Sequence, residues 1–146
     1  MNISDLLNTI NSTAKFKVDK KKGISIKELH EIEKTLGIKL PDDLVEFYTF
    51  SNGLEGDDLI FNIIPINEVE KDNDNVGEYL FFAEYLIYSE TCGLEIDLYD
   101  KNKYKFFYLT YEQEDYNKPQ RNYIGDSIID FITLYSNEGT FGIFRG

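Results

Sequence analysis

The chain has 146 residues, with 27 acidic and 15 basic side chains and a formal net charge of −12. Its 42% hydrophobic content, including 11 Phe and 11 Tyr, is enough for one folded domain and excludes a disordered chain. The negative charge disfavours nucleic acid as a partner because it repels phosphate groups. No apolar run reaches the roughly 18 residues of a membrane-spanning helix, so no membrane association is expected.

The cysteine content and the N-terminal sequence bear on the compartment. The single cysteine, Cys92, excludes an internal disulfide. The first residues lack the basic and apolar regions of a signal peptide. Together these features predict a cytoplasmic protein.

The charge is unevenly distributed along the chain. Residues 1–39 sum to +3, residues 40–100 carry sixteen acidic side chains and one lysine, and residues 101–146 are neutral. An acidic segment of this kind attracts a cationic partner and speeds its encounter, although solubility alone also explains it. The five lysines within residues 15–22 form a basic connector that is either a binding arm or a solvated linker.

Three helices are predicted in the first third of the chain. Apolar spacing indicates a short helix over residues 3–14. Ser25 begins the second helix with a capping box, and Gly37 suits a left-handed C-cap at its end. Pro41 opens the third helix, which Asn52–Gly53 ends because these residues tolerate positive φ.

Short strands and a closing helix are predicted in the rest of the chain. The closing helix is capped by Asp126 or Ser127, and polar loops are expected over residues 67–77 and 112–122. Helices first, then consecutive strands, then a helix indicate an α+β domain with a mainly antiparallel sheet. The strands are predicted over residues 59–66, 79–83, 86–88, 94–99 and 104–111.

The stretch from Ile26 to Gly53 contains a recognisable pattern. It has an Ile-Glu-x-x-Leu-Gly core, then Leu-Pro, an acidic pair, a helix and a closing Asn-Gly. This pattern resembles the signature of the SUKH superfamily, and the resemblance continues in order over about residues 24–135. The signature positions are Ile32, Glu33, Leu36, Gly37, Leu40, Pro41, Asn52 and Gly53.

The resemblance implies a fold and a role. The whole chain would be a single SUKH-like domain, with residues 1–23 as an N-terminal helix and the basic connector. The N-terminal helices and a C-terminal helix would pack on one curved, mainly antiparallel sheet, without catalytic residues. The commonest bacterial role in the superfamily is an immunity protein that binds and blocks a toxin, and other members are eukaryotic regulators linked to cell-wall assembly. The pattern identifies the fold better than the partner.

Glu33 is the unusual member of the pattern because it borders the apolar face of its helix. Either its carboxylate accepts hydrogen bonds from the backbone amides around Asn52–Gly53, or the side chain is exposed. The first alternative is favoured, since a carboxylate beside an apolar stripe needs a partner.

No pattern indicates a catalytic site, a cofactor or a metal. One histidine, His30, and one cysteine, Cys92, are too few for a metal cluster, and Cys92, expected in a turn, has no base near it in sequence. Residues 72–75 resemble the start of a calcium loop, but Val76 then occupies a ligand position. Catalysis is therefore not expected.

One carboxylate pair keeps a hydrolase as the third alternative. Glu95 and Asp97 lie two apart on a predicted strand and so share a face. Their spacing suits an acid–base pair, but an outward-facing strand surface explains the same alternation.

The favoured interpretation is recognition of a protein partner. Carboxylates aimed at lysine or arginine add specificity, and tyrosine is favoured at interfaces. We expect an immunity protein that neutralises a cognate, basic toxin, such as a nuclease, by direct one-to-one binding; a non-catalytic regulatory interaction module of the same fold is the alternative. The expected partner-binding residues are Glu55, Asp57, Asp58, Glu84, Tyr85, Glu95, Asp97 and Tyr99.

Overall fold

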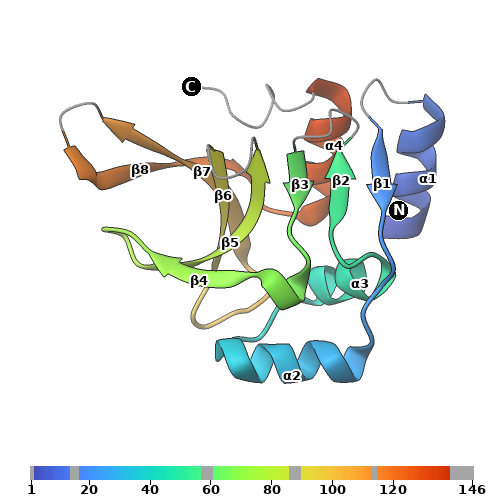
Figure 1. The fold of residues 1–146 in the computed structure, drawn as a ribbon, viewed down its shortest axis with the longest axis horizontal. Helices are drawn as coiled ribbons and strands as arrows, with labels where there is room; N and C mark the ends of the chain where they lie inside the picture. Colours follow the sequence, from blue (N-terminus) through green and yellow to red (C-terminus); the bar gives the residue numbers. More distant parts are fainter. Residues whose placement is uncertain (1, 14–16, 57–60, 86–89, 113–114, 139–146) are drawn as a thin grey trace.

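The computed structural model describes residues 2–13, 17–56, 61–85, 90–112 and 115–138. Within these ranges, four α-helices accompany one eight-stranded sheet (Figure 1), which confirms the predicted α+β class. Among the described residues, no helix is both long and apolar enough to cross a membrane. The helices are α1 (Ile3–Thr13), α2 (Ile26–Leu36), α3 (Asp42–Phe50) and α4 (Ile128–Glu138), and a 3-10 turn, η1, spans Ile66–Glu68.

The sheet runs in the order β1-β2-β3-β5-β6-β7-β8, and neighbouring strands in this order pair antiparallel. Two strands pair with the same edge of β5: β4 pairs with its first half and β3 with its second half. The strands are β1 (Val18–Lys20), β2 (Leu54–Gly56), β3 (Phe61–Ile63), β4 (Glu70–Asn73), β5 (Glu78–Tyr85), β6 (Glu90–Ile96), β7 (Tyr104–Glu112) and β8 (Asp115–Gly125).

One hydrophobic core joins the helices to one face of the sheet. Residues of α1, α3 and α4 share a single buried cluster with alternate residues of the strands. Phe61 of β3 stacks on Tyr135 of α4 with ring centroids 4.6 Å apart, and Phe82 of β5 packs edge-on against Phe131. Figure 1 places α2 and α3 at the end of the sheet where η1 lies. The opposite face of the sheet carries a second, smaller buried cluster of Tyr79, Phe107 and Leu109.

Several strands lie where the sequence indicates loops or linkers. Strand β4 falls inside the predicted loop 67–77, and β8 covers most of the predicted loop 112–122. All four side chains of β4 are exposed, so its pairing with β5 depends on backbone hydrogen bonds rather than on an apolar pattern. Strand β1 lies within the basic connector and pairs with β2.

The signature residues organise the connection between α2 and α3. Ser25 Oγ accepts the Glu28 amide, and Gly37 adopts the left-handed conformation (φ 69°), as the sequence predicts. Glu33 is buried, but the predicted partner is wrong: its Oε2 accepts the Leu40 amide at 2.7 Å instead of an amide near Asn52. Its second oxygen lies 2.6 Å from His30 Nδ1. The carboxylate therefore fixes the chain directly before Pro41.

Asn52 and Gly53 hold a different junction. Asn52 Oδ1 accepts the Ile66 amide at 2.8 Å, and its amide nitrogen donates to Asn67 Oδ1. Gly53 has φ 98°, and a Cβ there would lie 2.6 Å from the carbonyl oxygen of Ile63. The pair thus positions η1 against the end of α3, beside the face of the sheet that the helices leave uncovered.

Candidate partner-binding face

The strand register identifies which side chains lie opposite the helices. Antiparallel partners share a face of the sheet, and Phe61 and Ile63 are buried in the helical core, so Asn62 between them points away from it. The register then places Asp19, Glu55 and Glu84 in the same row as Asn62, across β1, β2, β3 and β5. A second row contains Glu70, Phe81, Gly93, Phe107 and Tyr123. We call the face that carries these two rows the open face.

A β-bulge brings Phe81 and Glu84 to the open face together. Phe81 pairs with Gly93 and Ala83 with Cys92, so Phe82 is the additional residue between them. Both Phe82 and Ala83 are buried in the core, which shifts the alternation by one position. Residues three apart on β5 therefore point the same way, an arrangement that simple period-two alternation does not predict.

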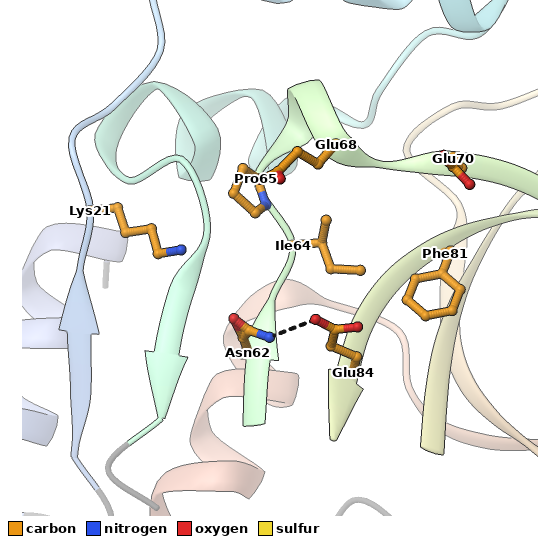
Figure 2. Close-up of a pocket in the computed structure, with 8 residues that line it drawn as sticks. All are labelled: Lys21, Asn62, Ile64, Pro65, Glu68, Glu70, Phe81 and Glu84. Atoms are coloured by element: carbon orange, nitrogen blue, oxygen red, sulfur yellow. Dashed lines mark hydrogen bonds between the residues drawn. The ribbon is translucent and has the colours of Figure 1, made fainter. Parts of the chain in front are cut away.

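A hollow of about 520 Å³ lies on this face, between the β1–β2 side and β5 (Figure 2). Helix α4 lies behind the strands in this view, so the hollow is on the side away from it. Glu84 Oε1 accepts a hydrogen bond of 3.0 Å from Asn62 Nδ2, which fixes the carboxylate against the strands. The polar and aromatic residues of its wall are Lys21, Asn62, Glu68, Glu70, Phe81 and Glu84.

The hollow has a negative balance of charge. Three glutamates and one lysine line it, and the ammonium group of Lys21 lies 3.5 Å from Glu55 Oε1, at the adjoining strand. A positively charged side chain of a partner would thus meet carboxylates that are not all neutralised within the protein. Such an arrangement favours contact with lysine or arginine and favours rapid encounter with a basic surface.

Glu95 also lies on the open face, but it is bound within the protein. Arg121 Nη1 donates to Glu95 Oε1 at 2.6 Å, and the Tyr123 hydroxyl donates to the same oxygen at 3.1 Å. The guanidinium also binds Asp74 and lies 4.5 Å from the ring centroid of Phe107. The Glu95 side chain keeps 31% exposure, so it contributes a partly neutralised carboxylate to the face.

No local pattern in the sequence indicates the ion pair between Arg121 and Asp74. The Arg121 side chain is 2% exposed and that of Asp74 1%. Burial alone would raise the pKa of Asp74, but hydrogen bonds from Arg121 and from the amides of Val76 and Gly77 outweigh it and hold the pKa below its ordinary value. The sequence feature that could have drawn attention to Arg121 is its rarity: it is one of only two arginines in the chain and lies within a polar stretch.

Asp97 and Tyr99 lie in the turn between β6 and β7, because β6 ends at Ile96 and not at Tyr99 as predicted. Asp97 Oδ1 accepts the amides of Tyr99 and Asp100 at 2.8 and 3.1 Å, and these bonds lower the pKa of Asp97. The Tyr99 side chain projects into solvent.

This geometry disfavours an acid–base pair. Glu95 and Asp97 border a common hollow of about 420 Å³, but Glu95 is bound by Arg121 and Asp97 by backbone amides. A general acid at neutral pH needs a raised pKa, whereas that of Asp97 is lowered.

The remaining expected residues are placed as follows. Asp57 and Asp58 lie outside the described residues, and Tyr85 is the last residue of β5. Cys92 lies in strand β6 and is buried, so its predicted position in a turn is wrong, because the strand extends through it. Within the described ranges, no group of three or more His, Cys, Asp or Glu side chains could hold a metal ion. Asp74, in the calcium-like stretch, is bound to Arg121.

The structure thus divides the expected site into two parts. Glu55 and Glu84 lie in one row of the open face, whereas Asp97 and Tyr99 lie in the turn that follows β6. Glu95 lies on the open face, one residue before the end of β6.

Comparison with known proteins agrees with the resemblance seen in the sequence. The model of the SMI1/KNR4 family (SUKH-1) matches residues 23–141, which is most of the chain. No curated protein and no solved structure gives a significant match. The chain therefore belongs to the SMI1/KNR4 family (SUKH-1), a family of toxin immunity proteins.

Proposed function

We propose that this protein is an immunity protein that neutralises a basic toxin by direct one-to-one binding through the open face. The observation that carries the proposal is the row of Asp19, Glu55 and Glu84 beside a hollow with three glutamates and one lysine. The proposed action is non-catalytic and takes place in the cytoplasm of the cell that is protected.

The chemistry of the face suits a toxin that acts on an anionic substrate. Enzymes that cleave nucleic acids bind phosphates with lysine and arginine, and those side chains are equally able to bind carboxylates. Glu84 is held by Asn62 and lies on a strand within the sheet, so its position is fixed before binding. Fixed carboxylates lose little conformational entropy in a complex. The open face would thereby block a cationic cleft by presenting negative charge in place of the substrate.

An immunity function predicts that a toxin is encoded beside this gene, and the proposal is tested with that toxin domain, purified as a catalytically inactive variant. We expect a one-to-one complex by calorimetry, and inhibition of the active toxin at equimolar protein. The double variant Glu55→Gln and Glu84→Gln should weaken binding about tenfold, or about 1.4 kcal/mol. Glutamine preserves shape, and at position 84 it is still able to accept a hydrogen bond from Asn62.

The matched control removes the same number of charges elsewhere. Glu31 and Glu46 are exposed on α2 and α3, so Glu31→Gln with Glu46→Gln should leave the affinity nearly unchanged. Equal loss in both double variants would mean that net charge, and not the open face, determines binding. The absence of any complex with the wild-type protein would refute the immunity function.

A further inference from the structure

The turn between β6 and β7 is fixed by its own polar groups. In addition to the bonds that Asp97 accepts from Tyr99 and Asp100, its amide donates to the carbonyl of Lys103 at 2.9 Å. The amide of Lys103 donates in turn to the carbonyl of Asp100, and the Asn102 amide donates to Asp100 Oδ1 at 3.0 Å. These bonds cross the turn in both directions and define one backbone conformation.

The same turn is attached to the beginning of α3. The Asp42 amide donates to Asn102 Oδ1 at 2.9 Å, and Lys101 Nζ donates to Asp42 Oδ1 at 2.8 Å. Asn102 Nδ2 lies 3.4 Å from the other carboxylate oxygen of Asp42. The contacts join residues about 60 positions apart in sequence, so the turn is fixed to the body of the domain.

The two large apolar side chains of the turn take no part in this network. Leu98 is 93% exposed and Tyr99 97% exposed. A single exposed apolar residue is ordinary on a protein surface. Here a leucine and a tyrosine adjoin each other on a backbone that is held in place, and nothing in the fold of the described residues requires either side chain. In many protein interfaces a few large side chains, tyrosine prominent among them, supply most of the binding energy, and a backbone that is ordered before binding lowers the entropy cost.

We propose that Leu98 and Tyr99 form an anchor that enters an apolar pocket of the toxin, with a polar group in that pocket to pair with the tyrosine hydroxyl. This inference rests on the proposed immunity function and adds a second element to it. The acidic open face would govern the rate of encounter, whereas the anchor would govern how long the complex persists. Most substitutions within an interface change the dissociation rate more than the association rate.

The binding test uses the same inactive toxin domain, with association and dissociation rates measured by surface plasmon resonance. Leu98→Ala with Tyr99→Ala should raise the dissociation rate about tenfold or more, with a much smaller change in the association rate. Thermal unfolding should be unchanged, because both side chains are exposed. Val76, which is 60% exposed in the β4–β5 turn, provides the control: Val76→Ala should leave both rates unchanged.

A second variant separates the fixed backbone from the side chains. Asn102→Ala removes the contact with the Asp42 amide but leaves Leu98 and Tyr99 in place, so dissociation should accelerate by a smaller factor. In the free protein, backbone NMR order parameters of residues 97–103 should be about 0.85, the value of a rigid backbone. Order parameters below about 0.6 would overturn the preorganised anchor.

The outcomes distinguish the two proposals. Wild-type binding with an unchanged dissociation rate in the Leu98→Ala/Tyr99→Ala variant overturns the anchor and leaves the immunity function intact. Failure of the wild-type protein to bind the neighbouring toxin overturns both. Self-association that depends on concentration and is abolished in the double alanine variant would assign Leu98 and Tyr99 to contact with a second copy of this chain. That result would overturn their assignment to the toxin.

Discussion

Arg121 and Asp74 form a bidentate ion pair, with Nε and Nη2 each 2.7 Å from a carboxylate oxygen, although 47 positions separate them in the chain. Both side chains are almost completely buried. The guanidinium also lies against the rings of Tyr79 and Phe107, which belong to β5 and β7. This pair joins the β4–β5 turn to β8 and supports the far end of the open face.

Removing the arginine should destabilise the protein strongly. Arg121→Met leaves the buried Asp74 carboxylate with only the Val76 and Gly77 amides as partners and no opposite charge. Loss of one member of a buried pair costs about 3–5 kcal/mol. Urea unfolding followed by circular dichroism measures the free energy of unfolding. The double variant Asp74→Asn with Arg121→Met should recover part of the loss, since position 74 then carries no buried charge. A change below about 0.5 kcal/mol in Arg121→Met would contradict the account.

The same pair makes stability depend on pH. The pKa of Asp74 is lower in the folded protein than its ordinary value of 3.8. A lowered folded-state pKa contributes stability that is present above the unfolded value and is lost as the pH falls through the folded value. The free energy of unfolding should therefore decrease below about pH 4, and the decrease should be smaller in Asp74→Asn. Identical pH profiles for the two proteins would exclude this role for Asp74.

Glu33 should contribute to stability through the Leu40 amide. Glu33→Ala leaves that buried donor without its acceptor, at a cost of about 1–3 kcal/mol in the free energy of unfolding. Glu31 lies on the same helix and is exposed, so Glu31→Ala should change stability by less than about 0.5 kcal/mol. Amide hydrogen exchange at Leu40 should accelerate only in the first variant. Equal effects of the two substitutions would rule out the structural role.

Gly53 and Gly37 should differ in their tolerance of alanine. At Gly37 a Cβ meets only Lys71 Nζ, at 3.5 Å, so Gly37→Ala should cost about 1–2 kcal/mol for the left-handed backbone. At Gly53 the backbone is also at positive φ, and the Cβ would in addition lie 2.6 Å from the Ile63 carbonyl oxygen. Gly53→Ala should therefore be the more destabilising of the two in thermal unfolding. The reverse order would show that the Ile63 contact relaxes readily.

Local features of the fold are readable from sequence because their partners are close along the chain. Ser25 bonds the amide of Glu28, three residues away, and the left-handed Gly37 ends the same helix. The capping of α4 is also local: Ser127 Oγ accepts the Asp130 amide, which decides between the two predicted caps. Apolar spacing predicts α1 over residues 3–14, and the helix spans Ile3–Thr13.

The features that sequence reasoning misses depend on distant partners or on backbone pairing. Strand β4 has only exposed polar side chains, so no apolar alternation marks it. The bulge at Phe82 reverses the alternation within β5 and brings Phe81 and Glu84 together. Alternation places Glu95 on the outward face correctly, but no local pattern indicates Arg121 as its partner.

The salt dependence of toxin association tests the central claim, that an acidic open face attracts a basic partner. Stopped-flow measurements with the inactive toxin domain would run from about 10 mM to about 1 M salt, over which the Debye length falls from about 30 Å to about 3 Å. We expect the association rate to fall tenfold or more, while the dissociation rate changes much less. An association rate that does not depend on salt would contradict it.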